Sequence, residues 1–423
     1  MFAIIKQKTF WLYLCAVILV LTLFSVAQFG ARNTIKVHNL PVAVLDESNG
    51  KASQQIKNNL TYQPKNKNTK IKWIVVHSRK QLRQGYNDKK YYGAVIIKKN
   101  FSANITAYTK RLQALIGQQK LAALIKKTPA AAKTTKVKTQ EKAFAAALQQ
   151  PAQQAGISFQ INQGMNTSAA TLLTTAFTKM GAQLNTKLGA KLTGAVQKSG
   201  ITLSSANWKS LSNPVKTTTK TVNKIPNKSV SGMAPFLMTV FAWLGALISS
   251  LLLWREHKKT DQNKNLGKNR LSLASINSEV LTGLIASAVI TGTIYVLAHG
   301  CYGVPVPDAG QFMLIVFFST YIFYRLQTGV LDLFGFAGWP LLILVWILST
   351  GVLSYAPEML SSFFRNWVYS WTPIRFALDM ITNTLYMPNA TTTGTDLTVL
   401  GSVGIVALIV MYVSPFLGKR EKR

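Results

Sequence analysis

Long, nearly uncharged apolar runs constrain this sequence more than any other feature. Hydrophobic residues make up 48% of its 423 residues, and only 14% are charged. A helix needs about 20 predominantly apolar residues to cross the hydrocarbon core of a bilayer. Six segments reach or approach that length: Phe10–Phe29, Ala234–Trp254, Val280–His299, Phe312–Phe334, Trp339–Tyr355 and Leu397–Leu417. Because backbone groups in lipid must hydrogen-bond to one another, we expect six transmembrane helices in a mainly α-helical, polytopic membrane protein.

The first run has a second interpretation. Lys6 and Lys8 precede it, and Ser25-Val26-Ala27 could serve as a signal-peptidase site, so residues 1–30 could be a cleaved signal peptide. The apolar stretch is longer than the usual signal core of about 7–15 residues, which favours a retained helix. In both cases the segment that follows would lie outside the cell.

The distribution of basic residues predicts the orientation in the membrane. Lysines precede the first run, six Lys or Arg lie within residues 255–270, and the chain ends in "KREKR". Short basic loops stay in the cytoplasm, whereas long domains cross largely regardless of charge. We expect a multi-pass protein of a bacterial, Gram-positive-like cell membrane, and the basic flanks predict its orientation. Both termini would be cytoplasmic, residues 31–232 extracytoplasmic, and residues 233–423 a five-helix membrane domain.

The segment between the first two runs is strongly basic. Between Gly30 and Gly232 there are 33 Lys or Arg and four acids, a difference of +29 out of +35 for the chain. Such a field attracts polyanions. The segment lacks aromatic and Gly-rich nucleic-acid signatures, so anionic cell-wall polymers or lipid headgroups are the expected partners rather than nucleic acid. The alternative is an ordinary solvated, Lys-rich surface.

Within this segment, residues 36–108 have the pattern of a small α/β unit. The β-branched runs Leu40–Asp46, Ile71–His77 and Tyr91–Phe101 alternate with helix-like stretches at Lys51–Leu60 and Ser78–Gln84. Residues 109–230 are rich in Ala and Lys and are predicted to be helical. We expect an apolar stripe in this segment to pack inside the domain or against another protomer. Residues 204–230 are expected to form a loop or an edge strand. The members of the stripe are Met165, Leu172, Ala176, Met180, Leu184 and Leu188.

Two further segments place charges beside apolar runs. In residues 370–387, Pro373 suits a helix start, and Arg375 and Asp379 share one helical face opposite apolar residues. We expect an outer re-entrant helix with both charges toward a substrate path, or alternatively a helix lying flat with its charges in water.

Arg325 and Asp332 also share a face, within the fourth run. Either they form a gate inside the membrane, or that span ends near Tyr324 and both lie at the interface.

The order of several motifs resembles the type-2 ATP-binding-cassette permease superfamily, and within it the phage-infection-protein-like branch. These motifs are "LPVAVLDESNG", "YYGAVIIKKNFSANI", "SGMAPFLMTVFAWLGALISSLLLW" and "GFAGWPLLILVWILSTGVLSYAPEMLSSFF", together with the Pro-Ile-Arg helix before the last run. The resemblance implies a homodimeric permease that exports or flips a hydrophobic or amphipathic substrate, with ATP hydrolysis on a separate subunit. It also implies a coupling element around Arg255–Glu279, with Arg255, Glu256 and Glu279 as candidates, although "WREHKKTDQNKNLGKNRL" lacks the usual acidic helix.

The sequence offers little catalytic chemistry. No phosphate-binding G-x-x-x-x-G-K-[ST] motif, G-x-S-x-G or H-E-x-x-H is present, and the four histidines are scattered. Cys15 and Cys301 make neither a disulfide framework nor a metal site. We expect no enzymatic activity, cofactor or metal in this chain. The alternative to a transporter subunit is a surface docking or scaffold protein for wall polymer, a secretion apparatus or phage adsorption.

Overall fold

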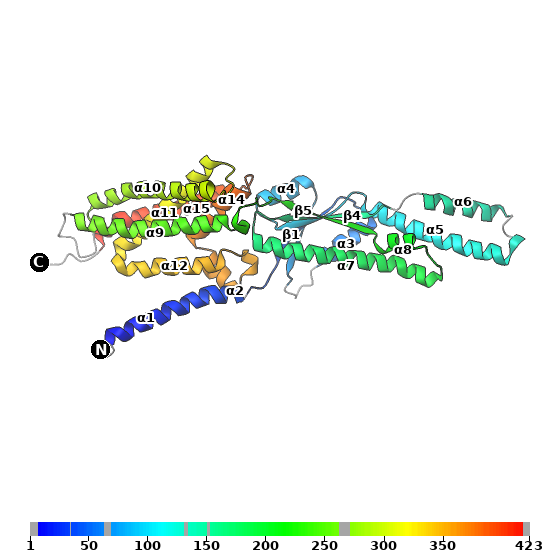
Figure 1. The fold of residues 1–423 in the computed structure, drawn as a ribbon, viewed down its shortest axis with the longest axis horizontal. Coiled ribbons are helices and arrows are strands. Elements are labelled where there is room, and N and C mark those ends of the chain that lie inside the picture. The colour runs from blue at the N-terminus through cyan, green and yellow to red at the C-terminus, as the bar shows by residue number, and fades with distance from the viewer. Residues whose placement is uncertain are drawn as a thin grey trace.

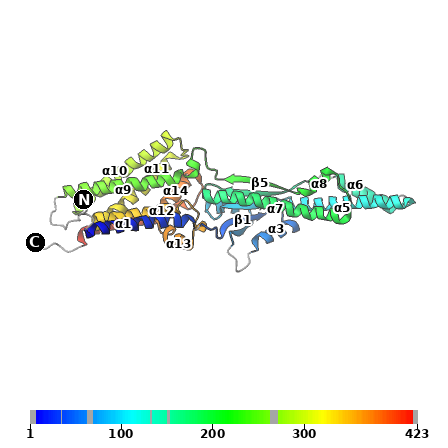
Figure 2. The ribbon, with the colours of Figure 1, turned by 60° about the horizontal axis from the view of Figure 1, so that its bottom comes forward.

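The computed structural model describes residues 7–33, 35–62, 69–130, 134–149, 153–261 and 271–417. Its strands are β1 (Leu40–Asp46), β2 (Ile71–Val76), β3 (Gly93–Ile97), β4 (Ala155–Asn162) and β5 (Val215–Val222). Its α-helices are α1 (Lys8–Ser25), α2 (Ala31–Asn33), α3 (Lys51–Thr61), α4 (Arg79–Asn87), α5 (Phe101–Lys127), α6 (Thr135–Gln149), α7 (Thr167–Ser199), α8 (Ser205–Ser212), α9 (Ala234–Thr260), α10 (Leu273–Tyr295), α11 (Ala309–Phe334), α12 (Trp339–Val352), α13 (Ser362–Phe364), α14 (Pro373–Tyr386) and α15 (Thr393–Val413). The molecule is elongated, with a helical bundle at one end, a sheet in the middle and a helical arm at the other end (Figures 1 and 2).

The sheet has five strands in the order β2-β1-β3-β4-β5. Strands β1, β2 and β3 are parallel, β4 is antiparallel to β3, and β5 is parallel to β4. The first three strands and the helices between them lie where the sequence pattern predicts them. We call the part built around this sheet, residues 35–229, the sheet domain.

The predicted division of the sheet domain at residue 108 is wrong. Strands β4 and β5 come from the part predicted to be helical, and β4 pairs directly with β3, from Gly93↔Ile161 to Ile97↔Ile157. The α/β unit therefore extends to residue 222. Strand β5 is the outermost strand of the sheet, in agreement with the edge strand considered for residues 204–230.

Alternating side chains of the strands divide between the two faces of the sheet. On one face Leu40 and Val42 of β1 join a buried cluster with α7, in which Phe159 stacks on Phe177 at 4.8 Å. On the other face Leu45 packs with residues of α4. Most of the predicted stripe lies along the edge of the first cluster and packs within the domain: Met165 just before α7, and Leu172, Met180, Leu184 and Leu188 on it.

Beyond the sheet, α5, α6, α8 and the distal half of α7 form the helical arm (Figure 1). A small buried cluster of Tyr108, Leu112, Leu192, Val196 and Leu211 holds α5, α7 and α8 together. Where α5 meets α6, a Cβ on Gly117 would lie 2.4 Å from the ring of Phe144, so the close contact requires glycine.

The bundle consists of α1, α9–α12, α14 and α15. Its core holds the fully buried Trp243 of α9, whose ring meets Phe323 of α11 edge-on at 5.0 Å. α1 begins and α15 ends at the end of the bundle remote from the sheet domain (Figure 1). The side chain of Gln28, just after α1, donates to Thr350 Oγ1 of α12 at 3.1 Å.

Four helical segments within the described ranges are long and apolar enough to cross a membrane: Ala234–Thr260, Leu273–Cys301, Ala309–Val352 and Thr393–Phe416. The third contains α11 and α12, joined by a 3₁₀ turn at Gly335–Gly338, and so covers two of the six predicted runs. α1, with 18 residues, is not among the four. The number of six spans stays a prediction.

Candidate functional site

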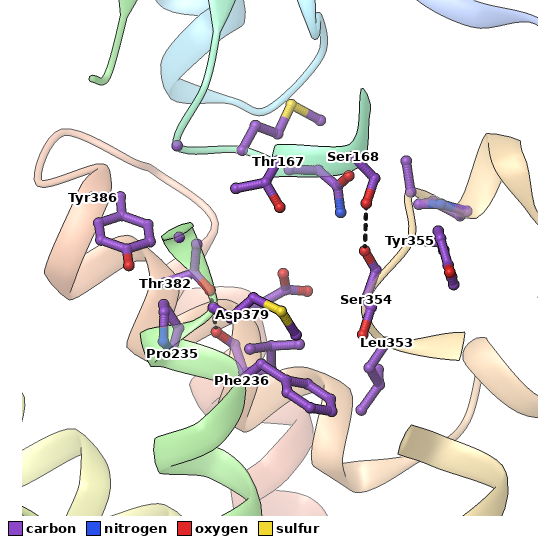
Figure 3. A pocket seen from close by; sticks show the side chains of 18 of the residues that line it. Thr167, Ser168, Pro235, Phe236, Leu353, Ser354, Tyr355, Asp379, Thr382 and Tyr386 are labelled. Carbon is purple, nitrogen blue, oxygen red and sulfur yellow. Dashed lines mark hydrogen bonds between the residues drawn. The ribbon is translucent and has the colours of Figure 1, made fainter. Parts of the chain in front are cut away.

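A cavity of about 280 Å³ lies where the sheet domain meets the bundle (Figure 3). Residues from seven places in the chain line it: the loop before β3, the start of α7 with the turn before it, Ile225 after β5, the start of α9, the segment 353–358, Tyr369 and α14. The cavity is thus built from both parts of the molecule, and it lies on the boundary between them.

Hydrogen bonds between the two parts hold this boundary together. The His38 N–H donates to the Glu358 carbonyl at 2.9 Å. At the start of α7, Ser168 Oγ donates to the Ser354 carbonyl at 3.2 Å (Figure 3). In the segment that follows α14, the Thr391 N–H donates to the Asn87 carbonyl at 3.1 Å. A change in the shape of the cavity must therefore strain or break some of these contacts.

Lys89 and Asp379 form an ion pair across the boundary. The Lys89 ammonium lies 3.4 Å from Asp379 Oδ1, and the Lys89 side chain is only 12% exposed. Lys89 follows the end of α4 in a left-handed conformation with φ +54°, and its N–H bonds to the Tyr86 carbonyl. This turn carries the lysine from α4 toward α14.

Arg375 lies one turn before Asp379 on α14 and also lines the cavity. Its guanidinium stacks over the rings of Phe376 and Tyr369, at 4.4 and 5.0 Å from their centres. Its Nε is buried and makes no hydrogen bond. Stacking compensates part of the desolvation of this cation but leaves a donor unused.

Two phenols complete the polar wall: Tyr92, which is buried, and Tyr369, which is partly buried. Tyr92 donates from its hydroxyl to Glu358 Oε2 at 2.8 Å. Burial, and next the charge of Glu358, raise the pKa of Tyr92 well above its usual value. Burial likewise raises the pKa of Tyr369, with the Asp379 charge as a second cause. Both phenols are neutral at physiological pH, so they act as hydrogen-bonding groups and not as anions.

The cavity therefore offers two cations, Lys89 and Arg375, and two anions, Glu358 and Asp379, beside apolar walls such as Phe236. Such a site can receive a polar or zwitterionic group attached to an apolar body. In the part of the chain that the structure describes, no group of His, Cys, Asp or Glu is arranged to hold a metal ion.

A second cavity, of about 610 Å³, lies between α9 and α10. Its walls are almost entirely apolar: Val230, Ala234, Leu237, Met238, Phe241, Gly245, Val289, Ile290, Thr293, Ile294, Leu297, Ala298, Tyr302 and Val304. The first turns of α9 line both cavities, with Pro235 and Phe236 in the first and Leu237 and Met238 in the second. A polar and an apolar cavity thus lie on two sides of one helix start.

The structure brings some of the predicted site residues together and separates others. Arg375 and Asp379 do share a face of α14 and line one cavity. Arg325 and Asp332 do not pair: Arg325 lies over the Tyr321 ring at 4.9 Å, and both carboxyl oxygens of Asp332 lack a hydrogen-bond partner. α11 continues as a helix through both residues to Phe334, and the gate and the interfacial position both stay predictions.

The coupling element predicted around Arg255–Glu279 stays a prediction, and residues 262–270 within it lie outside the described residues. α9 continues through Arg255 and Glu256 to Thr260, and both residues are exposed in its last turns, where Glu256 pairs with Lys259 at 2.6 Å. α10 begins at Leu273. Glu279 therefore lies inside α10, fully buried, and its assignment to the loop is wrong.

The apolar face predicted for residues 370–387 is buried, and α14 packs chiefly on α15, α9 and α11. The helix lies inside the bundle at its sheet-domain end, and most of its residues are buried.

Lys89, Tyr92 and Glu358 were not singled out from the sequence. Lys89 is 290 residues away from Asp379, and Tyr92 is 266 residues away from Glu358. No local spacing links such partners. The one available signal was the run of polar and aromatic residues "NDKKYY" before β3, which ordinary turn chemistry also explains.

Comparison with known families gives one match. Residues 8–413 match a family model described as "ABC-2 family transporter protein". No curated protein and no solved structure matches the chain.

Proposed function

Since the chain belongs to the ABC-2 family of transporter proteins, we propose that it is the membrane subunit of a transporter that exports or flips a hydrophobic or amphipathic substrate. ATP hydrolysis is assigned to a separate subunit, because the chain has no phosphate-binding loop motif of its own. The family match favours transport over the docking role. The finer assignment to the phage-infection-protein-like branch rests on the motif order alone.

The observation that supports an amphipathic substrate is the pair of cavities beside the start of α9. The apolar cavity between α9 and α10 has room for part of an acyl chain or a similar apolar body. The charged cavity at α14 suits a polar head with charges of both signs. In the proposed path, the apolar body enters between α9 and α10, and the head reaches Arg375 and Asp379 at the outer end. Arg325 remains a candidate on the path.

Blocking the apolar cavity tests this path. Leu237 lines the cavity, and Leu237→Trp fills part of it. Ile248→Trp on the same helix is the matched control, because Ile248 is 60% exposed and lies outside the cavity. The probe is a phospholipid with a photoreactive acyl chain in nanodiscs. We expect crosslinks to α9 and α10 that Leu237→Trp removes and Ile248→Trp retains. Equal crosslinking in both variants would contradict the proposed entry site.

Copurification tests the separate ATPase. The full chain is purified in mild detergent from its own cells, and the proteins bound to it are identified by mass spectrometry. We expect an ATP-binding-cassette ATPase in stoichiometric amount. The exposed last turns of α9, with Arg255 and Glu256, are its proposed contact, so Glu256→Lys should reduce the yield of the ATPase. Absence of any ATPase from the purified chain would contradict this part of the proposal.

We also propose that two copies of the chain form the complete translocation unit, as is usual in this family. The expected mass in nanodiscs, measured by light scattering, is that of a dimer. A monomeric mass together with the absence of crosslinked dimers in membranes would argue against it.

A further inference from the structure

Two acidic side chains meet inside the bundle, near its end remote from the sheet domain. Glu279 comes from the second turn of α10 and is 0% exposed. Asp332 comes from the last turn of α11 and is 3% exposed. Their carboxyl groups lie close enough to interact with each other, and the Trp254 indole of α9 lies beside Asp332. Three helices thus converge on one acidic pair.

Neither acid is compensated by a hydrogen bond. Among the residues that the structure describes, all four carboxyl oxygens of Glu279 and Asp332 are buried and without a hydrogen-bond partner. The shell around them is apolar, with Trp254, Leu271, Ile276, Leu331 and Met411 in one buried cluster on the same turns of the helices. An ionised carboxylate in such surroundings is strongly disfavoured, and two neighbouring ones repel each other.

The other titratable and charged groups around the pair have different contacts. Tyr324 donates from its hydroxyl to the backbone carbonyl of Glu279, and the Tyr412 hydroxyl bonds to Asn277. His257 Nε2 lies 3.1 Å from Thr282 Oγ1, while Lys258 and Arg325 lie over the rings of Trp254 and Tyr321. Asp261 adds a third negative charge that acts on Glu279. None of these groups hydrogen-bonds to either buried carboxyl group. Within the described residues no cation forms an ion pair with either carboxyl group, so a proton is the compensation that we consider.

A polar hollow lies at the same end of α9 and α10 as the pair. It measures about 310 Å³ and lies between the end of α9 and the start of α10. Its lining includes His257, Asp261 and Ser278, the last of which immediately precedes Glu279 in the chain. Water in this hollow is the nearest described source of a proton for the α10 side of the pair.

Buried hydroxyls beyond the pair are a second, independent observation. Ser287 and Thr291 follow Glu279 along α10 at helical spacing, and Thr328 lies one turn before Asp332 on α11. The hydroxyls of all three are buried and have no hydrogen-bond partner. Thr320 on α11, by contrast, bonds to the carbonyl of its own helix at 2.7 Å. Serine and threonine in apolar helices usually make that bond, so the three unpartnered hydroxyls indicate a polar seam able to hold water.

We propose that Glu279 and Asp332 form a proton-binding site between α10 and α11, filled from the polar hollow beside His257. In the binding step one carboxylate takes a proton from hydronium in the hollow and releases water. The resulting carboxylic acid donates a hydrogen bond to the other carboxylate. Loss of the proton to water leaves two repelling charges between α10 and α11, so occupancy of the site biases how these helices pack. The site is independent of the substrate assigned above.

Infrared spectroscopy of the full chain in nanodiscs tests the assignment. The carbonyl stretching band of a protonated carboxyl should persist at neutral pH and disappear only in alkaline buffer. It should be lost in the Glu279→Gln/Asp332→Asn double variant and unchanged in Glu256→Gln, which removes an exposed carboxylate at the same end. Asp396 remains in every variant, so difference spectra isolate the pair. No difference between the wild-type and double-variant spectra would overturn the proposal.

Thermal stability gives a second readout that does not depend on the band. The unfolding temperature of the wild type should fall from neutral to alkaline pH, and that fall should be absent in the double variant. Sodium chloride is compared with choline chloride at each pH. If sodium, and not pH, controls the stability of the wild type, the site binds a metal cation and the proton assignment is wrong. If the double variant falls with pH as the wild type does, the pair is not the titrating group.

Discussion

At the scale of single residues, the boundary between the sheet domain and the bundle depends on a few long-range contacts. One of them joins Tyr92, which is 3% exposed, to Glu358, and in it the Tyr92 hydroxyl donates to a carboxylate. A hydrogen bond to a charged group contributes about 1.5–3 kcal/mol, more than one between neutral groups.

Tyr92→Phe should therefore loosen this boundary by about 1.5–3 kcal/mol. The readout is hydrogen exchange at the His38 amide, which donates to the carbonyl of Glu358 itself. We expect exchange there to become roughly tenfold faster or more. Tyr91→Phe is the control, because Tyr91 packs on the other face of the sheet against Tyr86. If both variants exchange like the wild type, the Tyr92 hydroxyl does not stabilise the boundary.

At the scale of elements, α10 and α11 pack closely because glycine permits it. A Cβ on Gly283 would lie 2.1 Å from the Tyr324 ring, which is itself fully buried. Gly292, nine residues later on α10, has no neighbouring heavy atom within 4 Å of its Cβ position. The same substitution at these two positions therefore separates packing from helix propensity.

Gly283→Ala should destabilise the bundle by about 1–3 kcal/mol, the usual cost of overpacking. Gly292→Ala should be neutral or slightly stabilising, since alanine favours a helix by about 1 kcal/mol over glycine. The unfolding temperature of each variant in nanodiscs measures the difference. Equal effects of the two substitutions would show that Tyr324 moves aside without cost.

The sequence predicted some elements well because their signals are local. β1 coincides with "LPVAVLD", whose alternating side chains serve the two faces of the sheet, and the i, i+4 spacing correctly put Arg375 and Asp379 on one face of α14. β4 was missed because "AGISFQIN" contains Gly, Ser and Gln, and its partner β3 lies about 60 residues earlier. The Glu279–Asp332 pair was missed for the same reason: its members belong to different helices, and only the tertiary fold brings them together.

At the scale of the whole molecule, the sheet domain and the bundle are also joined through Asp88. Thr391 Oγ1 donates to Asp88 Oδ1 at 2.8 Å, and Lys90 lies 2.8 Å from the other carboxyl oxygen. The hydrogen bonds from Lys90 and then Thr391 hold the pKa of Asp88 below its usual value. A lowered pKa means that the contact stabilises the docked arrangement above the usual carboxyl pKa and is lost as pH falls through the lowered value.

Acidification should therefore weaken the docking of the sheet domain. Hydrogen exchange at the Thr391 amide, which bonds to the Asn87 carbonyl, should increase below the ordinary carboxyl range after correction for the intrinsic rate. In Asp88→Asn the corrected rate should be high already at neutral pH and should change less on acidification. A corrected rate in the wild type that does not depend on pH would contradict the role of Asp88.

The orientation of the whole chain is tested by labelling. Cys301 is exposed and follows α10, at the end of the bundle that faces the sheet domain, whereas Glu256 is exposed at the other end. A membrane-impermeant maleimide should label Cys301 in intact cells. Cysteine introduced by Glu256→Cys in a Cys301→Ser background should react only after permeabilisation. The opposite pattern would reverse the proposed orientation.

The long helix α7 connects the wall of the charged cavity to the helical arm. Its first turn supplies Thr167 and Ser168 to the cavity wall, and its last turns are packed into the helical arm. With 33 residues, α7 is about 50 Å long at 1.5 Å per residue. A tilt of about a tenth of a radian at the cavity would then displace the far end by about 5 Å. A rigid tilt of α7 at the cavity would therefore move the helical arm at the far end of the molecule.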